Sequence, residues 1–135
     1  MNITADTNLL ARAAIGDDDV QTARAEAELA AADLVAVTLP VLCELVWVMS
    51  HGYKLSSRRI SESIRGLIDT TNVVLNIPAT EAGLAHLESG GDFADGVIAY
   101  EGSLLGGQVF VSFDRRAVRL IEAQGREARV PASLP

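Results

Sequence analysis

Two aspartates stand where predicted strands give way to helices. Asp6 follows a very short apolar segment at the start of the chain, and Asp114 follows the apolar run at residues 109–111. Sites in open parallel α/β sheets form at the carboxyl ends of the strands, because the loops that leave the strands meet there. Both carboxylates can therefore serve a site, although an aspartate at the start of a helix is also a common N-cap.

Glu44 is the only charged residue between positions 36 and 50. A helix as apolar as this one is expected to be largely buried. A buried carboxylate is costly unless it is paired, protonated or bound to a metal. Glu44 also lies in the early turns of its helix, near the end of the preceding strand. The alternative is an exposed glutamate on a thin polar stripe.

Asp92 and Asp95 are three residues apart and follow two glycines. Asp92 suits the N-cap of a helix, and Asp95 its first turn, where the helix dipole favours negative charge. Residues three apart also share one helix face, so that both carboxylates can point at one centre.

Several carboxylates at one edge of a sheet repel one another, and a hard divalent cation relieves this repulsion. Mg²⁺ and Mn²⁺ prefer oxygen ligands. Such an ion can activate water and stabilise charge on a phosphate during an in-line displacement. The acidic set therefore predicts metal-dependent hydrolysis of a phosphodiester, without a nucleophilic side chain.

Alternating short strands and helices are predicted to position these carboxylates. Strands are expected before Asp6 and at residues 34–37, 73–75, 109–111 and 128–130. Helices are expected between Asp6 and Gly16 and at residues 20–32, 38–50, 56–71, 80–88, 92–105 and 115–124. This alternation predicts an α/β fold with a mainly parallel central sheet of about four to five short strands, flanked by helices on both faces. A chain of 135 residues is expected to form one domain, residues 1–135.

The composition is that of an ordinary globular protein, with 49% hydrophobic and 21% charged residues. No apolar run reaches the roughly 20 residues that cross a membrane, so no membrane segment is expected. The chain opens with a strand pattern, so we expect no signal peptide. The single cysteine, Cys43, excludes an internal disulfide framework and is typical of a reducing cytoplasm.

The net charge of −7 argues against broad electrostatic capture of nucleic acid. It leaves room for a nuclease, because the acidic residues can be concentrated in a metal site. Lys54 is the only lysine among 11 cationic residues, and arginine binds phosphate in a bidentate manner. Local phosphate contacts are therefore compatible with the sequence, while most of the arginines are expected to be solvated.

In order and spacing, four stretches resemble PIN-domain ribonucleases of the VapC type, the toxin half of toxin–antitoxin pairs. The matching stretches are ADTNLLAR at residues 5–12, Glu44 in its apolar helix, DFADGVIA at residues 92–99, and VSFD at residues 111–114. Each stretch is a weak signal alone, and the four in order cover essentially the whole chain.

This resemblance implies a parallel sheet with flanking helices and a homodimer. It implies an RNA substrate, a cognate DNA-binding antitoxin, and Mg²⁺ or Mn²⁺ as the cofactor. The implied catalytic metal ligands are Asp6, Glu44, Asp95 and Asp114. The implied supporting residues are Asn8, Asp92 and Ser112. The alternative is a PIN-like fold that acts as a catalytically inactive binding module.

Other classes fit the sequence less well. A receiver-type phosphoacceptor domain needs a lysine late in the chain, and a haloacid-dehalogenase-like phosphatase needs an aspartate where Asn8 stands. Neither a P-loop nor a Gly-x-Gly-x-x-Gly fingerprint occurs. His51 and His86 lack zinc-site spacing with Cys43, so surface or packing roles are expected for both. For Trp47 we favour core packing over a place in a partner groove.

Overall fold

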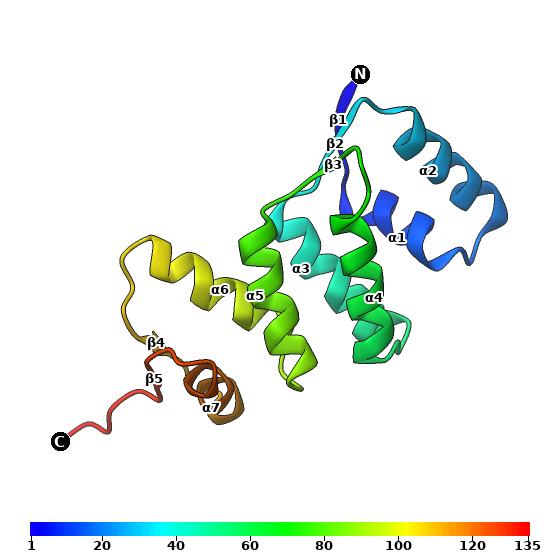
Figure 1. The fold of residues 1–135 in the computed structure, drawn as a ribbon. Helices are drawn as coiled ribbons and strands as arrows, with labels where there is room; N and C mark the ends of the chain where they lie inside the picture. The colour runs from blue at the N-terminus through cyan, green and yellow to red at the C-terminus, as the bar shows by residue number, and fades with distance from the viewer. The chain divides into compact units, whose positions relative to one another are not determined.

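A computed structural model describes all residues of the chain, Met1–Pro135, in which short strands alternate with helices (Figure 1). The chain divides into two compact units, Met1–Ile77 and Pro78–Pro135, and each is described here by itself. The predicted α/β class is confirmed. No helix has both the length and the apolar character needed to span a membrane.

The first unit contains a three-stranded parallel sheet in the order β1-β2-β3. Its elements are β1 (Asn2–Thr4), α1 (Thr7–Ile15), α2 (Asp19–Ala31), β2 (Leu34–Ala36), α3 (Leu39–Trp47), the π-helical turn η1 (Val48–Gly52), α4 (Ser57–Ile68) and β3 (Val73–Val74). Ile3 lies opposite Val35, and Val35 lies opposite Val73. The amide of Ala5 donates to Ala36, 3.0 Å away, so β1 and β2 stay paired up to the residue before Asp6.

Helices α1 and α2 form a hairpin because the sequence supplies a stop and a start between them. Gly16 ends α1 with φ +69°, a left-handed conformation that glycine adopts without strain. Asp18 then caps α2 by accepting a hydrogen bond from the amide of Gln21 at 3.0 Å. The Thr22 hydroxyl donates to the carbonyl of Arg12 at 3.0 Å, which ties the two helices together.

The core of the first unit is built from aliphatic side chains of the sheet and helices. Those with no measurable exposure are Val35, Leu42, Leu45 and Ile64. Trp47 lies outside this core: it is 60% exposed and stacks on His51, with ring centroids 4.9 Å apart. The prediction that Trp47 packs in the core is therefore wrong, because Leu42, Leu45 and Val46 form the buried face of α3.

The second unit contains three helices and a two-stranded parallel sheet. Its elements are α5 (Ile77–Glu88, whose first residue belongs to the first unit), α6 (Phe93–Leu104), β4 (Phe110–Val111), α7 (Arg115–Ala123) and β5 (Ala128–Arg129). Phe110 lies opposite Ala128. Helix α5 begins three residues before the predicted start at Thr80, because Pro78 is well tolerated in a first turn.

Two glycines allow α5 and α6 to pack at close range. A Cβ atom at Gly96 would lie 2.4 Å from the carbonyl oxygen of Ala82, and one at Gly83 would lie 2.6 Å from the ring of Phe93. Any larger residue at either position would push the helices apart. This packing fixes the first turn of α6, which carries Asp92 and Asp95, against α5.

Every strand pair is parallel, as predicted. The strands form two small sheets, one in each unit. A single PIN-like central sheet flanked on both faces stays a prediction.

Candidate active site

Asp6 lies where the sequence placed it, between β1 and α1. Its backbone is extended and its Oδ1 accepts a hydrogen bond from the amide of Leu9 at 2.9 Å, so it is the N-cap of α1. The side chain is exposed, and Oδ2 accepts no hydrogen bond. Capping and ligand binding are therefore compatible at Asp6, because the cap uses only one of the two carboxylate oxygens.

Glu44 lies beside the start of α1. Its Oε2 accepts a hydrogen bond of 2.8 Å from the hydroxyl of Thr7, the residue that follows Asp6. The side chain of Glu44 is exposed, so the prediction of a buried carboxylate is wrong. Glu44 lies on an exposed polar stripe of its helix, which was the alternative. The first unit therefore brings Glu44 to the helix end that carries Asp6. Asn8 is exposed in the first turn of the same helix.

The second unit gathers three of the predicted acidic residues. Asp92 caps α6, with Oδ1 3.4 Å from the amide of Ala94, and the amide of Asp95 donates to the carbonyl oxygen of Asp92 at 3.1 Å. Asp114 caps α7, with Oδ1 accepting from the amides of Arg116 and Ala117 at 3.0 and 3.1 Å. The charges of Asp92 and Asp114 both act on Asp95. These aspartates, from the first turn of α6 and the cap of α7, therefore form one acidic cluster.

Ser112 supports this cluster through the backbone. Its hydroxyl accepts a hydrogen bond from the amide of Asp114 at 3.0 Å, and its own amide donates to Arg129 at 3.1 Å. The bend between β4 and α7 is thus held on both sides. Ser112 is well placed for its predicted supporting role, because it fixes the residue that carries the Asp114 carboxylate.

The surroundings of Asp95 change the protonation of its carboxyl group. Its partial burial is the main reason why the pKa of Asp95 is raised above 3.8, and the negative charges of Asp92 and Asp114 raise it further. A nearby positive charge on His86 would lower it. The ionised form of Asp95 is therefore disfavoured, and a cation at this place would favour it.

His86 is the residue that the sequence did not single out for this cluster. It is completely buried in α5, its Nε2 has no hydrogen-bond partner, and its Nδ1 lies 3.5 Å from the side-chain nitrogen Nε2 of Gln124. A Cβ atom at Gly91 would lie 2.5 Å from Nε2, so only glycine fits beside the ring. In the sequence, Gly91 is the residue that could have indicated a side chain packed closely beside Asp92. The sequence does not show that this side chain is His86.

His86 is expected to make the protein sensitive to mild acid. Burial lowers the pKa of His86 below 6.5, and the three aspartates only partly oppose this effect. The unfolded chain therefore binds a proton that the folded chain resists, so stability falls as pH drops below 6.5. The slope for one group is at most about 1.4 kcal/mol per pH unit.

Urea unfolding at several pH values, in chelator, measures this effect. The difference in unfolding free energy between the parent and His86→Gln should shrink as the solution becomes mildly acidic. If the unfolding free energies of the two proteins change with pH by the same amount over this range, His86 is not buried in its neutral form.

The carboxylates fit a hard cation by ligand type. Asp6, Glu44, Asp95 and Asp114 offer only oxygen atoms, which Mg²⁺ and Mn²⁺ prefer. Within each unit, no three side chains of the types His, Cys, Asp and Glu form a group that could hold a metal ion. A complete cage is not required, because Mg²⁺ is usually held by one or two carboxylates together with water and substrate phosphates. Each unit holds two of the predicted ligands: Asp6 and Glu44 lie in the first unit, and Asp95 and Asp114 lie in the second.

Comparison with known proteins assigns no family to this chain: no family model matches it, and no curated protein is detectably similar in sequence.

Proposed function

We propose that this protein is a metal-dependent endoribonuclease with a PIN-like fold and acts as the toxin of a toxin–antitoxin pair. The observation that carries the proposal is the clustering of Asp92, Asp95 and Asp114, in which partial burial and then the neighbouring charges raise the pKa of Asp95 and disfavour its ionised form. A site that holds unfavourable negative charge before its ligand arrives is typical of a functional site. The order of the acidic stretches along the chain supports the choice of a nuclease.

The four proposed ligands have distinct positions. Asp6 and Asp114 each offer a carboxylate from the N-cap of a helix, and Glu44 is oriented by Thr7. Asp95 projects from the first turn of α6. A bound Mg²⁺ or Mn²⁺ would supply activation of water and stabilisation of charge on the RNA phosphate. Asn8, Asp92 and Ser112 would support the site by holding the backbone or by hydrogen bonding.

The first unit contains a mainly apolar hollow between its helices. A groove of about 240 Å³ runs between α1, α2, α3 and α4 and has a mainly apolar lining. Its lining residues are Leu10, Ala13, Ala14, Leu29, Leu45, Met49, Ser63, Gly66 and Leu67. We propose that an apolar helix of the antitoxin packs here and that the toxin forms a homodimer in the cytoplasm.

The test of the nuclease is cleavage of RNA by purified, partner-free protein. We expect fragments from single-stranded or structured RNA with Mg²⁺ or Mn²⁺, no fragments with excess chelator, and inhibition when the antitoxin is bound. Expression without the antitoxin should slow growth.

Intact RNA with either metal, together with normal growth, would instead favour a binding module. An antitoxin complex that cleaves RNA at the full rate would contradict the partner proposal alone.

A further inference from the structure

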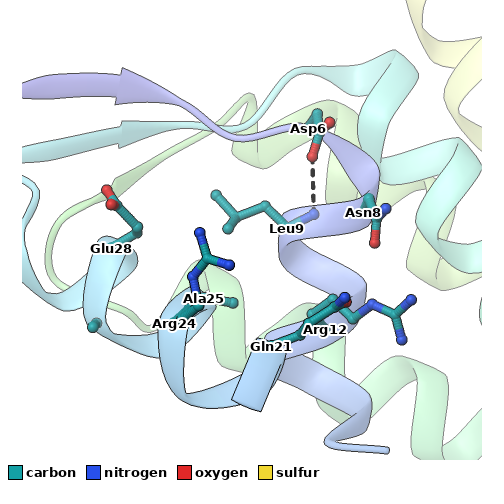
Figure 2. A pocket seen from close by; sticks show the side chains of 9 residues that line it. Asp6, Asn8, Leu9, Arg12, Gln21, Arg24, Ala25 and Glu28 are labelled. Carbon is teal, nitrogen blue, oxygen red and sulfur yellow. Dashed lines mark hydrogen bonds between the residues drawn. The ribbon is translucent and has the colours of Figure 1, made fainter. Parts of the chain in front are cut away.

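An open groove lies between α1 and α2, next to Asp6 (Figure 2). Its volume is about 470 Å³, within the range of small-molecule sites. Nine residues line it: Asp6, Asn8, Leu9, Arg12, Gln21, Arg24, Ala25, Ala27 and Glu28. The groove belongs entirely to the first unit, so its shape depends only on the helix hairpin described above.

Of the two arginines that line this groove, one is free to bind an anion. Arg24 is exposed, makes no ion pair or hydrogen bond, and points from α2 into the space opposite Leu9 (Figure 2). Arg12 is held by Asp17 at 3.2 Å, while its Nε is buried without an acceptor. Arg12 is therefore engaged with Asp17, and Arg24 is the arginine that can meet an occupant of the groove.

The rest of the lining combines polar and apolar side chains. Asn8 and Gln21 carry amide groups that can both donate and accept hydrogen bonds. Leu9 and Ala27 offer apolar surface. Glu28 lies one turn beyond Arg24 but does not form an ion pair with it. An occupant would therefore combine a negative group, hydrogen-bonding edges and a flat apolar body.

We propose that this groove binds one nucleotide of single-stranded RNA beside the proposed cleavage site. Arg24 binds the phosphate, which suits the planar fork of a guanidinium. Asn8 and Gln21 bind the exposed edge of the base through their side-chain amides, because the bases of single-stranded RNA present edges that donate and accept hydrogen bonds. The inference rests on the proposed nuclease function, because Asp6 at the end of the groove then lies next to the bound strand. A phosphate contact in this groove would also let a protein with a net negative charge bind RNA locally.

Binding to a short fluorescent oligoribonucleotide in chelator tests the groove without any cleavage. Arg24→Gln is expected to weaken binding about 5-fold and to lower the slope of log K against log salt by about 0.7, the value for one phosphate contact on a single strand. The control is Arg59→Gln, the same charge change at an exposed position of α4 outside the groove. Both substitutions keep good helix formers.

Glu28→Gln provides a second variant with the opposite sign. It removes a negative charge from the groove and should tighten RNA binding. Glu26→Gln, on the same exposed helix but outside the groove, should have a clearly smaller effect. Equal affinities for the Arg24→Gln and Arg59→Gln variants would overturn the inference, as would a parent that does not bind RNA.

Cleavage of the same RNA after Mn²⁺ is added separates this inference from the proposed function. Binding that depends on Arg24 without cleavage keeps the groove and removes the nuclease. Cleavage with an affinity that Arg24→Gln does not change keeps the nuclease and removes the groove. If Arg24→Gln weakens the binding of a protein partner and leaves RNA affinity unchanged, the groove is a protein-docking site.

Discussion

Replacing Asp95 by asparagine is expected to reduce metal-dependent RNA cleavage by at least about 100-fold, because even residues that only support metal ligands cost about 10–100-fold when they are mutated. The raised pKa of Asp95 means that its ionised form is disfavoured without a cation. Asparagine keeps the size of the side chain and removes the charge. Initial rates of cleavage of one labelled RNA, at saturating Mn²⁺, measure the effect.

Asp92→Asn is the matched comparison, since it makes the same chemical change three residues away on the same helix. Asp92 is the N-cap of α6, and asparagine caps a helix about as well as aspartate. Its cap hydrogen bond is long, at 3.4 Å, so little stability depends on it. We expect this variant to keep about a hundredth to a tenth of the parent rate, the range for a supporting position, and more than Asp95→Asn keeps. Equal residual rates in the two variants would contradict the prediction that Asp95 is a metal ligand and Asp92 only a supporting residue.

The sequence predicted the aspartates at helix starts well, because capping is local chemistry. Asp6, Asp92 and Asp114 each cap the helix that follows, and all three helices begin where expected. The carboxylate and the helix start are adjacent in the chain, so no tertiary packing is needed to place one against the other. For the same reason, helix capping alone is enough to explain why aspartate occurs at these three positions.

The positions that depend on packing were predicted less well. Residues 36–50 are so uniformly apolar that periodicity does not select a buried face. Glu44 and Trp47, three residues apart, turned out to share the exposed face of α3. His86 is buried because Gly83 and Gly96 let two helices pack closely, and this contact joins residues far apart in the chain. Which face of a helix is buried, and where two helices cross, depends on tertiary contacts that the local sequence pattern does not reveal.

Mn²⁺ is expected to raise the melting temperature of the parent protein through binding to its folded state. A ligand at about 100 times its dissociation constant stabilises the folded state by about 2.7 kcal/mol. For a chain of this size, that corresponds to a rise of about 10 °C. Asp6→Asn and Asp95→Asn change one proposed ligand in each of the two units. If all four ligands serve one ion, both variants should lose most of this rise.

Asp69→Asn is the control for these melts, because Asp69 is exposed at the end of α4 and its carboxylate makes no hydrogen bond. It should respond to Mn²⁺ like the parent. A full response in Asp6→Asn together with a lost response in Asp95→Asn would confine the metal to the second unit, and the proposed ligand set would be wrong.

The same melts in chelator separate the two variants by charge. Because the pKa of Asp95 is raised above 3.8, the folded state binds more protons than the unfolded state as pH rises from 3.8 to the raised pKa. Stability therefore falls through that range, and the loss persists at neutral pH. Asp95→Asn removes this loss and should melt above the parent at neutral pH, with the difference vanishing in acid below 3.8. Asp6→Asn should melt close to the parent in chelator, because asparagine replaces the cap of α1. If Asp95→Asn melts at or below the parent at neutral pH, the acidic cluster does not store the repulsion that a cation would relieve.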